Sequence, residues 1–188
     1  MSLALGFHLS STPFASLPAT LRCKACWALA NLLGASLLAR VAALSRPGII
    51  TGLAALMEPA SGIAPETPGT SETRRLAAWA ASNLAHGAPP SSLASTRGLI
   101  PALAAVVQRH ALLLDQGPGA SRERGVVDEG GAAAEACWAM GHIARGANGA
   151  VSELLDSGLS ESLIRVLRLE RQRQQEVGVE AADSRSSS

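Results

Sequence analysis

Three tryptophans bring three segments of the chain into register, and the residues around them repeat. The segments are CKACWALANLLGASLLARVAALSRPGIITGLAALM, RLAAWAASNLAHGAPPSSLASTRGLIPALAAVV and AEACWAMGHIARGANGAVSELLDSGLSESLIRVL. In each, an alanine lies two residues before the tryptophan, another follows it directly, and a leucine or isoleucine lies five residues after it. Spacings of three and four place these positions on one stripe of a helix, so the same helix is predicted three times.

The second half of each segment repeats as well. A glycine follows each tryptophan by 19 to 21 residues, and apolar residues then recur at helical spacing. Glycine tolerates positive φ, so a sharp turn before a second long helix is expected at Gly48, Gly98 and Gly158. A short helix is predicted before each of these turns, at Leu37–Leu44, Ser91–Ser95 and Ala150–Leu155.

Composition agrees with an all-α fold. Only 3% of the 188 residues are aromatic, although 47% are hydrophobic. The core must therefore consist mainly of Ala, Leu, Val and Ile. Alanine and leucine favour helices, and the residues typical of strands are sparse.

The repeat defines the domain organisation. The tryptophans are 52 and 59 residues apart, whereas helical repeats of this kind span roughly 42 residues. Two Pro/Gly-rich stretches, 58–72 and 115–131, account for the excess and are expected to be inserted loops. Residues 21–176 are assigned to the repeats, 1–20 to an irregular lead-in or the remnant of a preceding repeat, and 177–188 to a disordered tail.

The charge distribution argues against some classes of partner. The net charge is +1, which gives no basic face for nucleic acid. No acidic residue precedes Glu58, so the N-terminus resembles either a transit peptide or the tail of a truncated repeat; the first twenty residues contain no arginine. The longest uncharged apolar run, between Lys24 and Arg40, is too short to cross a bilayer, so no membrane span is predicted.

The sequence contains no catalytic or metal-binding motif above background. Cys23 and Cys26 form a C-x-x-C pair without the second pair of ligands that zinc requires, and the four histidines are scattered. Three cysteines are too few for a disulfide framework and indicate a reducing compartment. We therefore expect a protein that is not an enzyme and has no metal and no cofactor.

A polar residue lies four positions after each tryptophan, and this pairing allows two interpretations. The pairs are Trp27 with Asn31, Trp79 with Asn83, and Trp138 with His142. A spacing of four places both side chains on one helix face. Repetition would stack the pairs into a ladder that binds a ligand; alternatively, the indoles pack in the core and the asparagines cap neighbouring helices.

The WALANLL, WAASNLAHG and WAMGHIARG blocks, together with the GLIPALAAVV pattern, resemble armadillo-repeat proteins over residues 21–170. This resemblance implies a right-handed α-solenoid of about three repeats, in which the third helix of each repeat lines a concave groove. The Trp-x-x-x-Asn ladder is similar to that of the importin-alpha branch, which comprises nuclear-import receptors. There the asparagines hold the backbone of an extended basic peptide and the indoles flank its Lys/Arg side chains.

The resemblance sets the functional expectation. It implies a protein-binding or peptide-binding module of the cytoplasm or nucleus that acts in nuclear protein import and recognises extended, Lys/Arg-rich peptides. The expected site consists of Trp27, Asn31, Trp79, Asn83, Trp138 and His142. The alternative is a structural scaffold that packs on another protein through its solenoid surfaces, because terminal repeats that lack polar caps leave apolar ends open.

Overall fold

A computed structural model describes residues 17–46, 48–58, 68–87, 95–116, 129–146 and 149–186, with only the backbone described for residues 68 and 176–186. The described residues are helical and contain no strand, so the all-α prediction is confirmed for them. Their elements are α1 (Ala19–Ala35), α2 (Leu37–Leu44), α3 (Ile49–Met57), α4 (Pro68–Ala85), η1 (Arg97–Leu99), α6 (Ile100–Asp115), α8 (Glu129–Gly146), α9 (Ala150–Asp156) and α10 (Leu159–Ser186).

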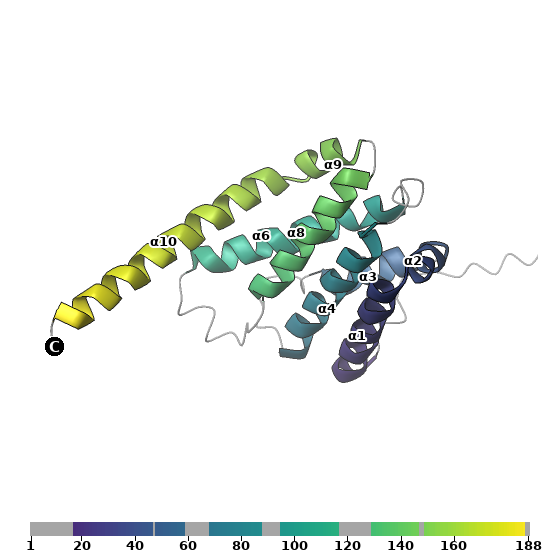
Figure 1. Cartoon of the computed structure of the whole chain (residues 1–188), viewed down its shortest axis with the longest axis horizontal. Coiled ribbons are helices and arrows are strands. Elements are labelled where there is room, and N and C mark those ends of the chain that lie inside the picture. Colours follow the sequence, from purple (N-terminus) through teal and green to yellow (C-terminus); the bar gives the residue numbers. More distant parts are fainter. Residues whose placement is uncertain are drawn as a thin grey trace, which may run out of the picture.

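The helices lie in two layers (Figure 1). The tryptophan helices α1, α4 and α8 pack side by side in that order, with α1 at one end. The second layer contains α3, α6 and α10, in which α3 contacts α6 and α6 contacts α10. Each of the first two members also packs on the tryptophan helix that follows it in sequence, α3 on α4 and α6 on α8.

Small residues allow the tryptophan helices to approach closely. In α4 and α8, the alanines two residues before and one residue after the tryptophan are fully buried, and the same stripe ends with a larger buried residue, Leu84 or Ile143. Val106 and Met57 of the second layer are also fully buried and join the same apolar core. Dense packing of this kind accounts for most of the free energy that stabilises the helices, since isolated helices are marginal in water.

Local signals set several helix boundaries. The Ser36 side chain accepts a hydrogen bond from the Ala39 backbone amide and caps α2. Gly48 and Gly158 adopt positive φ before α3 and α10, as the predicted glycine turns require. Gly98 does not, because it lies inside the 3₁₀ turn η1. A glycine at this position allows the turn to approach α3 closely, because a Cβ on Gly98 would lie 3.0 Å from Ile50 Cγ2.

Four assigned segments differ from the structure at their ends. Helix α4 begins at Pro68 and α8 at Glu129, so both helices start inside the segments expected to be loops (58–72 and 115–131). Proline suits the first turn of a helix, where its missing N–H is not needed. Helix α10 continues to Ser186, so residues 177–186 are helical instead of a disordered tail. Of the short helix predicted at Ser91–Ser95, only Ser95 is described. The lead-in assigned to 1–20 lies outside the described residues up to residue 16, and its last two residues already belong to α1, which begins at Ala19.

Candidate functional site

Two of the three indoles are open to solvent on the layer formed by α1, α4 and α8. Trp27 is 55% exposed and Trp138 is 64% exposed, which is unusual for the largest apolar side chain. Trp79, on the central helix, is half-buried and packs against the core. The interpretation of all three tryptophans as core residues therefore fails for the outer two.

The residue four positions after each tryptophan has a different partner in each helix. Asn31 is exposed and donates a 2.9 Å hydrogen bond to the backbone carbonyl of Trp27, one turn earlier in α1. Asn83 donates a hydrogen bond of the same length to the Ala30 carbonyl, and so links α4 to α1. Gly34 makes room for this contact, because a Cβ there would lie 3.1 Å from Asn83 Nδ2.

The third pair, Trp138 and His142 of α8, makes a similar contact at the end of the preceding tryptophan helix, α4. The His142 ring of α8 meets His86, the residue directly after α4, edge to face, with ring centroids 4.8 Å apart. His86 lies seven residues after Trp79, as Gly34 lies seven residues after Trp27. His142 also stacks on Trp138 with centroids 6.0 Å apart. Asn83 and His142 therefore both contact the residue seven positions after the tryptophan of the preceding helix.

The environment of His142 favours its neutral form. Burial lowers the pKa of its imidazole below the ordinary value of 6.5, and the neighbouring His86 and Arg145 lower it further. The Arg145 guanidinium lies 3.0 Å from His142 Nδ1. Arginine can only donate, so the neutral His142 accepts at Nδ1. A neutral ring at this position does not repel a cationic ligand.

A pocket opens beside Trp27 between α1 and α4. It has a volume of about 310 Å³ and is lined by Lys24 and Trp27 of α1 and by Glu72 and Arg75 of α4, among others. An exposed carboxylate next to an indole suits a cation, although Lys24 and Arg75 offset its charge. Glu135 of α8 is not among the residues that line this pocket; burial raises the pKa of its carboxyl group, and the nearby Arg75 opposes that effect.

Sequence reasoning missed a buried charge cluster on the inner side of the layer. Arg74 of α4 is fully buried and forms an ion pair with Glu129, the first residue of α8. Arg74 Nε also donates to the Met57 carbonyl at the end of α3, at 3.1 Å, and Arg109 Nε of α6 lies 3.3 Å from Glu129 Oε1. Glu129 fell within a segment expected to be a loop, so no spacing signalled its partners. The cluster joins four helices, and its central pair, Arg74 and Glu129, is almost fully buried.

The cysteines lie in packed surroundings. Burial, with a smaller effect of Cys23, raises the pKa of the Cys26 thiol to about 11, and burial also raises the pKa of Cys137. Thiols of this kind stay protonated near neutral pH and are poor nucleophiles. Among the residues whose placement is described, no three His, Cys, Asp or Glu side chains gather as metal ligands would.

One described helical stretch, Arg97–Asp115, is long and apolar enough to cross a bilayer by length and composition alone. Of its apolar window, 56% is buried inside the protein, as in a core helix. The bent pair α2–α3 passes the same test only if both helices are taken as one span.

No family model, curated protein or solved structure matches the chain. The fold and the site therefore define the protein by class only: over its described residues it is all-helical, and three tryptophan helices form one layer. The distinguishing feature of this layer is the tryptophan face, defined here as Trp27, Asn31, Trp79, Asn83, Trp138 and His142.

Proposed function

We propose that the chain is a non-enzymatic peptide-binding module of the armadillo type, and that its tryptophan face binds an extended, Lys/Arg-rich peptide. The observation that carries this proposal is the exposure of Trp27 and Trp138 on the outer helices of one layer. An exposed indole loses the hydrophobic stabilisation that burial provides. Two such losses at the same repeat position indicate a surface kept open for a ligand.

The polar groups of the face suit an extended backbone. Each asparagine amide has two donor hydrogens and one acceptor oxygen. Asn31 and Asn83 each use one donor within the protein. The second donor and the acceptor oxygen of each can pair with the C=O and N–H of a peptide strand. The indoles then contact the aliphatic stems and cationic ends of Lys or Arg, which contributes about 0.5–2 kcal/mol per contact.

The helix arrangement supports the armadillo assignment. Recurrence of one tryptophan helix in a first layer and one glycine-preceded helix in a second is what stacked three-helix units produce. A right-handed solenoid of about three repeats is therefore proposed, with the tryptophan face along its groove. A role as an adaptor in nuclear protein import, in the cytoplasm or nucleus, follows as part of this proposal.

The proposal is tested by fluorescence-polarisation binding of a labelled Lys/Arg-rich peptide to the native chain and to Trp27→Ala/Trp138→Ala. Both indoles are exposed, so their removal leaves the packing of the core intact. Leu38→Ala is the matched control, because Leu38 is 79% exposed on α2 and lies off the tryptophan face. We expect micromolar binding by the native chain and the control, and a loss of about tenfold or more in the double variant.

Three comparisons make the test selective. A peptide of the same length with Glu in place of Lys/Arg separates basic recognition from general stickiness, and circular dichroism checks that each variant remains helical. Equal affinity of the native chain and the double variant would contradict the proposal. So would the absence of binding to a helical native chain.

A second candidate, a structural scaffold, is favoured by a separate observation. Large apolar side chains are exposed at both ends of the layers as well as on the tryptophan face: Leu32 is 58% exposed on α1 and Leu167 is 69% exposed on α10. Packing of these ends on another protein would bury them. This role is compatible with peptide binding, since it uses different surfaces.

A further inference from the structure

One helix stripe is buried in two tryptophan helices and exposed in the third. The stripe lies two residues before, one after and five after each tryptophan. In α4 and α8 these positions, which include Leu84 and Ile143, are all 0% exposed. In α1 the equivalent alanines are exposed, and Leu32 is 58% exposed. Helices α4 and α8 each have a tryptophan helix on the side that precedes them, whereas no described helix precedes α1 in the layer.

At the opposite end of the molecule, α10 has an exposed apolar position that is buried in the other second-layer helices. Leu167 of α10 occupies the repeat position of Met57 in α3 and Val107 in α6. Met57 and Val107 are 0% and 1% exposed, but Leu167 is 69% exposed. Gly141 of α8 likewise has open space where a Cβ would point. In the described residues, no tryptophan helix follows α10 to cover these positions, as α4 follows α3 and α8 follows α6.

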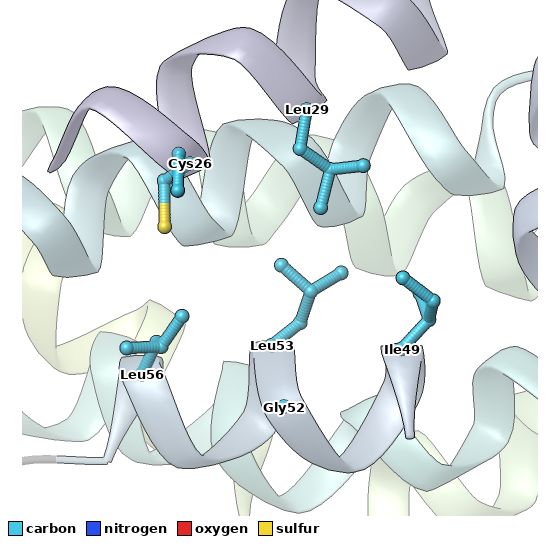
Figure 2. Close-up of a pocket in the computed structure, with 7 residues that line it drawn as sticks. Cys26, Leu29, Ile49, Gly52, Leu53 and Leu56 are labelled. Carbon is cyan, nitrogen blue, oxygen red and sulfur yellow. The ribbon is translucent and has the colours of Figure 1, made fainter. Parts of the chain in front are cut away.

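An apolar pocket lies between α1 and α3, at the end of the layers where no described helix precedes α1 (Figure 2). Leu29 and Cys26 of α1 face Leu53, Ile49 and Leu56 of α3 across it. Within the chain, the second-layer helix α3 contacts both the tryptophan helix α4 and the next second-layer helix α6. The pocket thus lies where a second-layer helix would pack on α1 and α3, and α10 is a second-layer helix without a following tryptophan helix.

We propose that the two ends bind each other between copies of this chain, head to tail. Helix α10 of one copy packs over α1 of the next, as α3 packs on α4 and α6 on α8, and α8 lies beside that α1. Ile164 and Leu167, which are 49% and 69% exposed, bury against the pocket between α1 and α3. The half-repeat α9–α10 and the half-repeat α1 together make one complete three-helix unit.

The α8 face of one copy and the α1 face of the next are complementary, because the proposed contact repeats the α1–α4 and α4–α8 contacts within the chain. Toward the next helix, α1 presents Cys26, Ala30 and Leu33, and α4 presents Ala78, Ser82 and Ala85, all of them buried. The equivalent residues of α8 are Cys137, Gly141 and Ala144, which are at least as small apart from the cysteine. A second copy therefore meets a surface of the kind that α4 and α8 already accept.

The polar ladder would continue across the contact. Asn83 and His142 contact the residue seven positions after the tryptophan of the preceding helix, Gly34 and His86 respectively. Asn31 has no such helix among the described residues and bonds to its own helix instead. Arg145 is the equivalent residue of α8. In the assembly, Arg145 of one copy lies beside Asn31 of the next, where its guanidinium donates to the amide oxygen.

Such a contact is heterologous, because it joins two different surfaces of the chain. The assembly therefore does not end at a dimer, and its average size increases with protein concentration. Sedimentation velocity over micromolar to near-millimolar protein measures this growth. We expect the average mass of the native chain to rise with concentration, and Leu32→Glu or Leu167→Glu to remain monomeric. Both residues are exposed in the single copy, so the variants should keep their helicity. Leu112→Glu, which alters a 52% exposed leucine of α6 away from both ends, should assemble like the native chain.

Mixing the two blocked variants tests the head-to-tail geometry. Leu32→Glu retains the α8–α10 face and Leu167→Glu retains the α1 face, so the mixture should form a one-to-one dimer and stop there. Dimerisation of either variant alone would indicate a symmetric contact and overturn the proposal. A native chain that is monomeric at all concentrations would also overturn it. If that monomer began to associate once residues 1–16 were removed, the α1 face would belong to that segment.

This assembly does not depend on peptide binding, because the apolar residues that carry it, Leu32 and Leu167, lie outside the tryptophan face; Asn31 is the one residue that both proposals use. Loss of assembly in Leu32→Glu with unchanged peptide affinity separates the two proposals. Failure of the basic peptide to bind leaves the sedimentation result unaffected.

Discussion

The side-chain amide of Asn83 on α4 donates a 2.9 Å hydrogen bond to the backbone carbonyl of Ala30 on α1. Asn31, at the same repeat position of α1, bonds only within its own helix, to Trp27. One sequence position therefore has a structural role in one repeat and remains at the surface in another. This difference distinguishes residues of the tryptophan face that are available to a ligand from those that also hold the helices together.

The first prediction compares these two asparagines. Asn83→Ala removes a hydrogen bond between helices and should lower the free energy of unfolding by about 1 kcal/mol. Asn31→Ala should leave it unchanged or raise it by roughly 0.5 kcal/mol, because alanine is the better helix former. Urea denaturation followed by circular dichroism measures both. Equal effects of the two substitutions would mean that the Asn83 contact does not stabilise the joint.

The second prediction concerns the buried ion pair between Arg74 and Glu129, which are 0% and 3% exposed. Glu129→Gln leaves a cationic guanidinium without its carboxylate and should lower the free energy of unfolding by about 3 kcal/mol or more. Glu153→Gln is the matched control, since its pair with Arg97 is partly solvated and should contribute less than about 1 kcal/mol. Chemical denaturation with identical losses for both variants would refute the structural role of the cluster.

The third prediction is a pH dependence from His142. Because its pKa in the folded chain lies below the ordinary 6.5, the unfolded chain takes up its proton first on acidification. The free energy of unfolding should therefore fall as the pH drops below that value, and should be unaffected by this group at higher pH. His110, whose pKa is also lowered by burial, adds to the same trend.

An NMR titration of the histidine ring signals checks this directly. His142 should titrate below 6.5, and His86→Ala should raise its pKa, because the variant removes a neighbour and exposes the ring. In a stability series, His142→Gln should lose less free energy of unfolding on acidification than the native chain does. An unperturbed pKa for His142 would argue against the His86–His142 contact.

Much of the helical framework could be predicted from the repeat. The expected helix at Leu37–Leu44 coincides with α2, and the stripe closed by Leu84 and Ile143 is buried as its spacing indicates. These features depend on local periodicity and on alanine content, both of which can be read in one segment at a time. The exposure of Trp27 and Trp138 was left open by the sequence, since a helix tryptophan packs inward or outward at the same spacing.

Other features depend on which segments meet, and the spacing of residues does not encode this. Arg74 and Glu129 are 55 positions apart in sequence, and Asn83 and Ala30 are 53 apart. Gly98 occupies the same repeat position as Gly48, yet it lies inside the 3₁₀ turn η1 without positive φ, and a Cβ there would lie 3.0 Å from Ile50. Glycine thus provides a positive-φ turn at Gly48 and allows close helix packing at Gly98.

The indole N–H signals of the three tryptophans provide the most direct test of the proposed peptide-binding face. The chain has only three tryptophans, so substituting each in turn assigns every signal in a ¹H–¹⁵N spectrum. Titration with an unlabelled Lys/Arg-rich peptide should shift the signals of Trp27 and Trp138 in parallel, with a smaller shift for the half-buried Trp79. Saturating peptide that leaves all three indole signals in place would contradict binding at this face.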